Sequence, residues 1–291
     1  MKKKSKKKLL VIGGTGFIGY HLLKYAIKLG WKCYSISRNQ PKKKRKVKKV
    51  KYFFFDIRIK KKFTNKVLKE YNYIVNLSDI QLNHLNLFLE NKPGKFLHVG
   101  SSAEYGNLKK QPLKESSICK PVSKYGKKKL KITKNLIKKF ERNFFPLIII
   151  RLFQIYGSND YSNKIVPFAI KNCLKDKKFK ITLGYQTRDF SHIDDIIRAI
   201  ILLLKSNKKI IFGKIFNIGS GKDIKIKDLV IKIKKIIGKG KPNFGQKKMR
   251  KNEIIISKPS IKKVKDYVNW QPKISLEDGI RNVYYNHFIN L

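Results

Sequence analysis

The chain has 291 residues, enough for one large domain or two closely joined ones. Hydrophobic residues make up 42% of it, a share that allows a substantial buried core and argues against wholesale disorder. The three cysteines, Cys33, Cys119 and Cys173, are an odd number without a C-x-x-C pair. This excludes a disulfide framework and a cysteine zinc site, and it favours a reducing compartment.

The charge of the chain is extreme. Lys and Arg total 70 against 18 Asp and Glu, which gives a formal net charge of +52. A basic excess of this size is typical of nucleic-acid-binding proteins. However, nine of the 70 basic residues are arginine, the other 61 are lysine, and they are spread over every segment. Because lysine, isoleucine and asparagine have A/T-rich codons, we favour a compositional origin of the charge over a nucleic-acid surface.

Two basic segments imitate targeting signals. Residues 41–47 read PKKKRKV, the sequence of a viral nuclear-import signal, and we interpret them as a solvated loop after a strand. Residues 1–8 are basic and precede an apolar run, as in a secretory leader, but glycines interrupt the run and no A-x-A cleavage site follows. No window of about 18 residues stays apolar. We therefore expect a cytoplasmic protein without a membrane span.

Strands and helices are expected to alternate through the first half of the chain. The expected strands span residues 9–12, 31–37, 51–55, 73–77, 96–99 and 146–152, and the helices span residues 17–29, 81–90 and 123–141. Strands separated by helices form βαβ crossovers, which build a doubly wound parallel sheet. The sequence thus predicts an α/β fold with a Rossmann-type NAD(P)-binding domain over residues 1–155.

The order is less regular after residue 155. Helices are expected at 164–175, 194–204, 226–237 and 276–285, with short strands at 215–218 and 253–256. We interpret residues 156–291 as a smaller substrate-binding lobe, some elements of which return to the main sheet.

A glycine-rich turn follows the first strand. Gly13, Gly16 and Gly19 are spaced three residues apart, between the strand and the first helix. Glycines permit a tight turn and let the backbone approach a pyrophosphate, which sits at the helix N-terminus. The turn, together with Phe17 and Ile18, is therefore predicted to bind a dinucleotide.

The end of the second strand indicates which dinucleotide is bound. An acid there binds the ribose hydroxyls of NAD, whereas a basic residue accommodates the extra phosphate of NADP. The segment Ser37-Arg38-Asn39 holds no acid, so Arg38 favours NADP(H), with NAD(H) as the alternative. Asp56 and Ile57, at the end of the third strand, are expected to meet the adenine.

Tyr125 and Lys129 are four residues apart on the helix expected at 123–141, so they share one face. A lysine ammonium beside a phenol lowers the tyrosine pKa from about 10, which makes the phenol usable as a general acid or base near neutral pH. With 61 lysines such a pair arises easily by chance. Its place after Ser101-Ser102 and before the sixth strand supports a catalytic role.

Several motifs along the chain resemble those of one family. Besides the glycine turn they are Val99-Gly-Ser-Ser-Ala-Glu-Tyr-Gly106, Pro121-Val-Ser-Lys-Tyr125, Arg151-Leu-Phe-Gln-Ile-Tyr-Gly157, Arg188-Asp-Phe-Ser-His-Ile-Asp-Asp195 and Trp270-Gln-Pro. In combination they resemble the extended short-chain dehydrogenase/reductase superfamily, and within it the NAD-dependent epimerase/dehydratase group that acts on nucleotide sugars.

The resemblance implies a catalytic set. Ser101 matches the residue that holds the reacting sugar oxygen, and Ser102 is a substitute for it on the substrate side. Tyr125 matches the acid that protonates this oxygen, and Lys129 matches the lysine that bridges the tyrosine and the nicotinamide ribose, so both also count as cofactor-binding residues.

The resemblance also implies a substrate site and two departures from the family. Arg188 and Arg250 match arginines that bind the sugar diphosphate. Gln154 stands at a substrate-contacting position where the family usually has asparagine. The stretch from 78 to 96 is short, and because relatives use this region for dimer packing, a homodimer is in doubt. Four of the five histidines, His21, His84, His98 and His192, are not at metal-ligand spacing, so we expect no metal and interpret these four as structural.

Within this family the sequence favours a reductase. Dehydratases of this family carry a Thr-Asp-Glu pattern at the position where this chain has Ser101-Ser102-Ala103. The resemblance therefore implies that the acids needed for water elimination are missing. The chain length and residues 243–280 most resemble reductases of the CDP-abequose synthase type. We therefore expect an NAD(P)-dependent enzyme that reduces the C4 keto group of a nucleotide 4-keto-6-deoxyhexose. A C4-epimerase that retains NAD is the alternative, and a non-catalytic, basic nucleic-acid-binding protein is a distant one.

Overall fold

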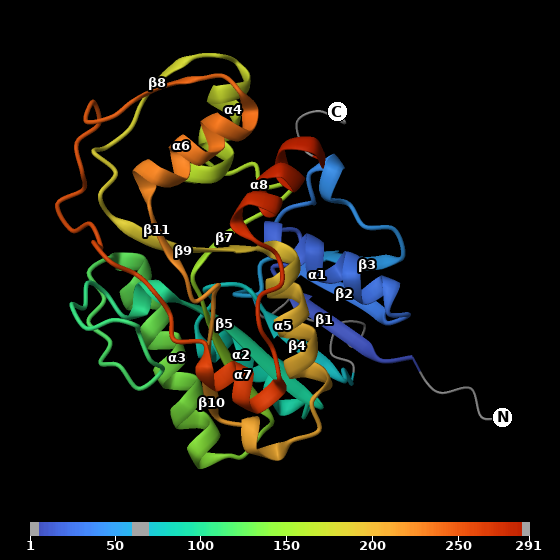
Figure 1. Cartoon of the computed structure of the whole chain (residues 1–291). Coiled ribbons are helices and arrows are strands. Elements are labelled where there is room, and N and C mark those ends of the chain that lie inside the picture. The colour runs from blue at the N-terminus through green and yellow to red at the C-terminus, as the bar shows by residue number, and fades with distance from the viewer. Residues whose placement is uncertain (1–5, 60–69, 287–291) are drawn as a thin grey trace. The chain divides into compact units, whose positions relative to one another are not determined.

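The computed structural model describes residues 6–59 and 70–286 (Figure 1). Its contacts divide the chain into two units built from alternating segments. The first unit comprises residues 1–101, 127–151 and 197–216, and the second comprises residues 102–126, 152–196 and 217–291. The predicted domains, 1–155 and 156–291, extend over residues 1–5, 60–69 and 287–291, which lie outside the described residues.

Short apolar segments form the strands of the first unit. The sheet contains β1 (Lys8–Ile12), β2 (Lys32–Ser37), β3 (Val50–Phe54), β4 (Tyr73–Asn76), β5 (Lys95–Ser101), β6 (Leu147–Leu152) and β10 (Lys214–Ile218). The strand order is β10-β6-β5-β4-β1-β2-β3, and β1 pairs in parallel with both β2 and β4. The chain order therefore reverses at β1, which in open α/β sheets is the place where ligands bind. The predicted Rossmann-type sheet is confirmed.

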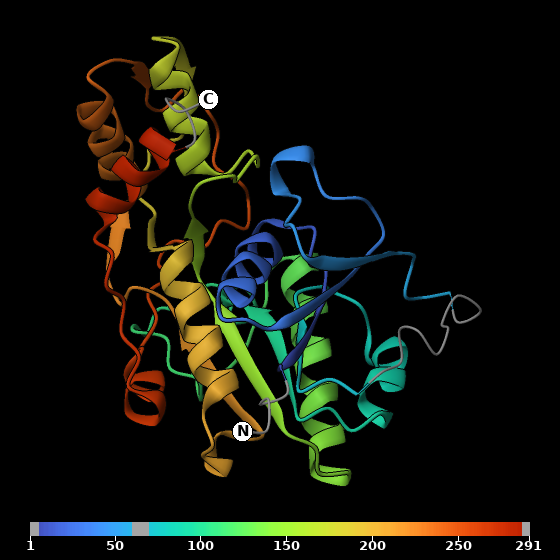
Figure 2. The ribbon, with the colours of Figure 1, turned by 90° about the vertical axis from the view of Figure 1, so that its right-hand side faces the viewer.

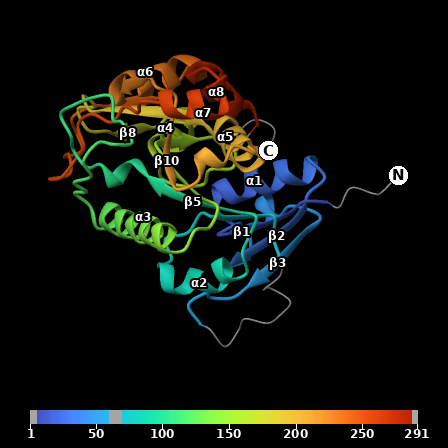
Figure 3. The same ribbon diagram turned by 90° about the horizontal axis from the view of Figure 1, so that it is seen from below.

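Helices cover both faces of this sheet. Figures 2 and 3 show α1 (Phe17–Lys28) and α5 (Ile193–Lys205) on one face, with α2 (Leu82–Glu90) and α3 (Lys124–Arg142) on the other. The core beneath α2 and α3 is a cluster of buried side chains from the strands and both helices, which includes Leu10, Ile12, Ile74, Leu85, Phe88, Phe96, Ile132, Leu136 and Ile149. Burial of such a cluster is the main favourable term in folding.

The second unit has two small sheets. One contains β7 (Gln154–Tyr156), β9 (Thr187–His192) and β11 (Asp223–Lys225), and the other contains β8 (Lys178–Lys180) and β12 (Lys241–Asn243). Its helices are α4 (Ile165–Leu174), α6 (Ile226–Ile237), α7 (Lys262–Val268) and α8 (Leu276–Tyr284). Its core cluster includes Tyr156, Ile170, Phe190, Leu229 and Ile280, so β7, β9, α4, α6 and α8 share one apolar interior.

Two expectations need correction. Residues 253–256 do not form a strand, although the Ile255 carbonyl accepts a hydrogen bond from Thr187 N–H of β9 at 2.8 Å. The basic run at 41–47 contains a short 3-10 helix (η1, Lys43–Arg45), and Arg45 is not solvated. Its guanidinium lies 5.9 Å from the ring centre of Phe17, and the residue is 9% exposed. A cation over an aromatic face is attracted to it, which explains the burial.

Among the described helices, none is both long and apolar enough to cross a bilayer. The thiols of Cys33 and Cys173 are free and buried, and burial raises their pKa values to about 12 and about 11. Both thiols are therefore protonated near neutral pH, where a thiol is a poor nucleophile.

Candidate active site

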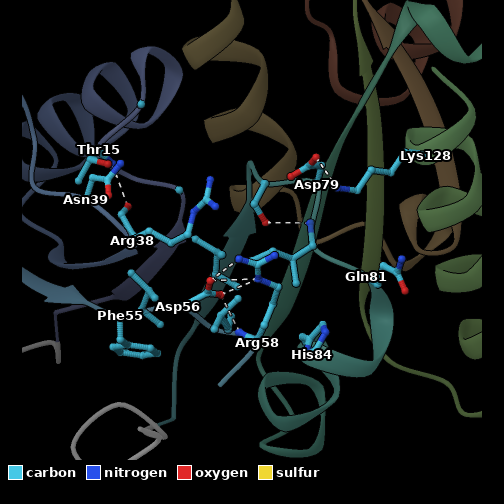
Figure 4. A pocket seen from close by; sticks show the side chains of 18 residues that line it. Thr15, Arg38, Asn39, Phe55, Asp56, Arg58, Asp79, Gln81, His84 and Lys128 are labelled. Atoms are coloured by element: carbon cyan, nitrogen blue, oxygen red, sulfur yellow. Dashed lines mark hydrogen bonds and ion pairs between the residues drawn. The ribbon is translucent and has the colours of Figure 1, made fainter. Parts of the chain in front are cut away.

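A cavity of about 620 Å³ lies in the first unit, where the strand order reverses. Figure 4 shows the side chains that surround it. Residues from the ends of the strands and from the following loops line it: Ile12, Gly13, Thr15, Gly16, Ile36, Ser37, Arg38, Asn39, Phe55, Asp56, Ile57, Arg58, Ser78, Asp79, Ile80, Gln81, His84 and Lys128. Five of the predicted cofactor residues, Gly13, Gly16, Arg38, Asp56 and Ile57, are among them.

The glycine turn forms one wall of the cavity. Gly13 has a positive φ of 86°, a conformation that side chains disfavour. A Cβ added to Gly19 would lie 2.5 Å from Gly14 Cα, and one added to Gly14 would lie 2.4 Å from Ser35 Oγ. Gly16, the N-cap of α1, offers no side chain that would compete with a ligand for the first-turn N–H groups. The turn therefore fits a pyrophosphate, and Gly14 has a packing role that the motif spacing did not indicate.

Asp56 and Arg58 form a fork in the lining of the same cavity (Figure 4). Arg58 Nε donates to Asp56 Oδ1 at 2.9 Å and Arg58 Nη2 donates to Asp56 Oδ2 at 2.5 Å. These bonds, with a weaker contribution from the charge of Arg38, hold the pKa of Asp56 well below its usual range. Arg38 is exposed and lies on the same side of the cavity (Figure 4). Two guanidinium groups and one carboxylate give this side of the cavity a net positive charge.

A second ion pair lies on the other side of the cavity. Lys128 Nζ of α3 donates to Asp79 Oδ2 at 2.7 Å, and this bond lowers the pKa of Asp79 (Figure 4). His84, interpreted from the sequence as structural, lines the same cavity. Its Nδ1 is buried, and it has no hydrogen-bond partner among the described residues. The sequence did not place His84 or Lys128 at this cavity, because no motif links either residue to a cofactor site.

Lys129 joins α3 to the ends of two strands. Its Nζ donates to the carbonyl of Val99 in β5 at 2.9 Å and to that of Ser78 after β4 at 3.2 Å, and the residue is 3% exposed. Tyr125 lies one turn earlier on the same helix and is 52% exposed. Ser101, the last residue of β5, follows Val99 by two residues. Lys129 is thus fixed by two carbonyls, and the exposed phenol of Tyr125 lies one turn away on the same helix.

A buried network supports this lysine. Asn76 Oδ1 accepts hydrogen bonds from Ser78 N–H at 3.0 Å and from Ser78 Oγ at 2.6 Å, so its amide nitrogen faces His98 Nδ1 at 3.1 Å. Burial, together with the charge of Lys129, lowers the pKa of His98 well below its usual value. His98 is therefore neutral, accepts through Nδ1 and carries its proton on Nε2. The ring helps to hold Ser78, whose carbonyl receives Lys129.

The predicted substrate residues lie in the second unit. Arg188 of β9 donates through Nη2 to Glu253 Oε1 at 2.5 Å. Glu253 N–H donates to the Arg250 carbonyl at 3.1 Å, so Arg250 begins the turn that leads to the carboxylate partner of Arg188. Gln154 of β7 is paired in register with Phe190, two residues beyond Arg188. Ser102 begins the 3-10 helix η3 (Ser102–Glu104).

Two buried aspartates of the Arg188–Asp195 motif hold loops in place. Asp189 accepts hydrogen bonds from Ser220 N–H at 2.8 Å and from Ser220 Oγ at 2.7 Å. Burial raises the pKa of Asp189 to about 6, against the opposing effect of these bonds. Asp195 accepts from the N–H groups of Lys273 and Ile274, each at 3.0 Å, and its carbonyl accepts from Trp270 Nε1 at 3.1 Å. The motif is therefore structural at these two positions.

The described residues contain no group of three or more His, Cys, Asp or Glu side chains arranged to hold a metal ion.

The sequence matches the model of one protein family, described as "NAD dependent epimerase/dehydratase family", over residues 9–84 and 70–219. The chain belongs to this family. The match includes the glycine turn, the Tyr125–Lys129 helix and Arg188. Most of the candidate site residues described above therefore lie within the matched region.

Relatives of this epimerase/dehydratase include the CDP-abequose synthase of Salmonella typhimurium. It is 30% identical over 139 residues, which cover 46% of each chain. The match thus spans about half the length of this relative and of the CDP-abequose synthase of Salmonella muenchen.

Solved structures cover nearly the whole chain. The UDP-glucuronic acid 4-epimerase of Bacillus cereus, solved with UDP-glucuronic acid and NAD, is 28% identical with a TM-score of 0.83, covering 95% of this chain and 98% of that one. The UDP-glucose 4-epimerase of Thermotoga maritima has a TM-score of 0.88 at 23% identity, covering 97% and 99% of the two chains, and it supports the fold alone.

Proposed function

We propose that this protein is an NADP(H)-dependent reductase that acts on the C4 keto group of a nucleotide-linked 4-keto-6-deoxyhexose. The observation that carries the proposal is the anchoring of Lys129 at the ends of β4 and β5, one helical turn from the exposed Tyr125. Its specific direction, reduction at C4, is supported by the similarity to CDP-abequose synthases.

Each catalytic residue has a physical role in this proposal. Lys129 is held by two carbonyl oxygens, so its ammonium stays next to the strand ends, one helical turn from the phenol of Tyr125. Tyr125 protonates the alkoxide that develops as the keto group is reduced. Ser101 donates a hydrogen bond to the same oxygen, which stabilises developing negative charge.

The cavity of the first unit is suited to the cofactor. The glycine wall has no room for side chains and borders the N-terminus of α1, where a pyrophosphate is stabilised. The bound nicotinamide supplies the hydride, and the protein orients it and polarises the substrate. Asp56 is already paired with Arg58, so Arg38 and Arg58 are the groups suited to receive the 2′-phosphate of NADP(H).

A C4-epimerase is the second candidate. It is favoured by the structural similarity to the Bacillus cereus UDP-glucuronic acid 4-epimerase along almost the whole chain. The same tyrosine, lysine and serine serve both reactions, but an epimerase regenerates its cofactor in each cycle, whereas a reductase consumes it.

The two functions are separated by following the cofactor. We expect stoichiometric NADPH oxidation with a nucleotide 4-keto-6-deoxyhexose from a panel of CDP-, UDP-, dTDP- and GDP-linked sugars. With a 4-hydroxy sugar and NAD we expect no conversion to the C4 epimer. Epimer formation without net NADH production would instead establish the second candidate.

The variant Tyr125→Phe tests the chemistry directly. It removes the proton donor but keeps the ring, so we expect kcat to fall by about 10² to 10⁴. NADPH binding, measured by fluorescence titration, should stay within about twofold of wild type. Retention of turnover would show that Tyr125 is not the acid.

A further inference from the structure

The segment that carries Glu253 is fixed by hydrogen bonds instead of a strand ladder. We refer to residues 253–260 as the strap. Ile255 in the strap accepts from Thr187 N–H of β9 at 2.8 Å and donates its own N–H to Asn107 Oδ1 at 3.1 Å. The strap is therefore held on both edges, which fixes the backbone from which the Glu253 side chain extends.

Arg188 is nearly enclosed by this arrangement. Its side chain is 12% exposed, and its Nη1 donates to the carbonyls of Thr187 and Ile255 at 2.7 and 3.4 Å, while Nη2 donates to Glu253. A guanidinium has five N–H donors, so two remain for a ligand. Burial lowers the pKa of Arg188, and the Glu253 carboxylate opposes this effect. The arginine is thus kept charged and fixed, with part of its donor set unused.

We propose that Glu253 is a positioning residue for the diphosphate of the substrate: its carboxylate fixes the Arg188 guanidinium beside the turn that carries Arg250. The proposal rests on the proposed function, because it takes a nucleoside diphosphate group as the ligand. The hydrogen bond from Glu253 N–H to the Arg250 carbonyl closes that turn at 3.1 Å. Glu253 therefore contacts the Arg188 guanidinium through its side chain and the Arg250 backbone through its N–H.

Two effects of this carboxylate oppose each other. Its negative charge repels a diphosphate, but it also holds a long side chain in one conformation before the ligand arrives. Fixing a flexible side chain on binding has an entropic cost, and a preformed guanidinium fork avoids it. The exposed Arg250 and the lysines at 247, 248 and 251 offset the repulsion. We therefore expect the gain from preorganisation to exceed the remaining repulsion, so that Glu253 strengthens binding of the diphosphate.

The test is a double-mutant cycle on nucleotide binding. Titration calorimetry with CDP, UDP, dTDP and GDP identifies the nucleoside diphosphate that wild type binds. For that nucleotide we expect Glu253→Gln to raise Kd about tenfold in the wild-type background. In the Arg188→Ala background the same change should have almost no effect. In Glu253→Gln the affinity for NADPH should be unchanged. Where turnover is measurable, kcat should also be unchanged, and the KM for the nucleotide sugar should rise.

The matched control is Asp223→Asn. Asp223 Oδ1 pairs with Lys258 Nζ of the strap at 3.3 Å, so this variant removes a charge contact to the strap without touching either arginine. It should bind the nucleotide like wild type. Unchanged or tighter binding by Glu253→Gln, or equal losses in both backgrounds, would overturn this inference alone. If wild type bound NADPH but none of the four nucleotides, the proposed substrate class would fail and this inference with it.

Discussion

Lys129 is the residue on which the catalytic hypothesis depends most. Replacing it with methionine leaves the Val99 and Ser78 carbonyls without their buried donor, so we expect a loss of about 1–3 kcal/mol in the free energy of unfolding. We also expect kcat to fall at least about a hundredfold. Urea unfolding and single-turnover kinetics measure the two effects.

Lys128 provides the control for this variant. It is the adjacent lysine, and its exposed ion pair with Asp79 is worth less than about 1 kcal/mol. Lys128→Met should therefore leave the unfolding free energy and kcat near wild type, and because Lys128 lines the cofactor cavity, any loss of activity should appear in KM for NADPH. Equal losses of kcat in Lys128→Met and Lys129→Met would mean that catalysis depends only on the total charge of α3.

The second prediction at this scale concerns cofactor choice. Arg38 lines the cavity and is exposed, whereas Asp56 is occupied by Arg58. A charge-assisted hydrogen bond to phosphate is worth roughly 1.5–3 kcal/mol, so Arg38→Ala should raise KM for NADPH by about 10- to 100-fold and leave KM for NADH unchanged. Lys44→Ala removes the same charge from an exposed loop outside the cavity and should change neither. Parallel losses for both cofactors would refute the phosphate assignment.

At the scale of elements, Asp189 couples β9 to the loop at 219–222 and makes stability depend on pH. Its pKa is raised to about 6 in the folded chain, above the ordinary value of 3.8, so the native state binds a proton more tightly than the unfolded chain. This contribution is complete below about pH 4 and is lost as the pH rises through 6.

The variant Asp189→Asn isolates this effect from the other carboxylates. Because asparagine does not titrate, wild type should lose roughly 2 kcal/mol of unfolding free energy relative to the variant between pH 4 and 7. Chemical unfolding at each pH gives this difference. A difference that is constant over the whole range would show that Asp189 is already ionised at pH 4.

At the scale of the whole molecule, the charge of +52 acts on every anionic ligand. Long-range attraction raises the association rate, and salt screens it. We expect kcat/KM for NADPH to fall several-fold between about 50 and about 200 mM salt, while kcat stays nearly constant. Steady-state kinetics over this range measures the effect. A loss confined to kcat would exclude steering.

The same titration addresses the nucleic-acid alternative. A protein that functions by binding DNA or RNA should show an affinity that falls by about 10³–10⁵ over this salt range and that does not respond to Tyr125→Phe. Weak binding that lacks this steep slope would leave the lysine excess as a feature of composition.

The sequence by itself determined whatever depends on neighbouring residues. The glycine turn, the alternation of strands and helices and the Tyr125–Lys129 spacing are all local patterns, and helical geometry alone places that pair on one face. The strands of the main sheet and the bounds of most helices could be predicted because they too depend on local patterns. The three-residue strands β7, β8, β11 and β12 escaped prediction, because so short a segment shows no period.

Only the tertiary structure decided which charged groups are already paired. Arg188 and Glu253 are 65 residues apart, and no local pattern relates them. The same holds for Lys129 and the carbonyls that anchor it, 30 and 51 residues away. Such contacts arise from chain crossovers that bring strand ends together, so their partners are set by packing and not by spacing along the chain.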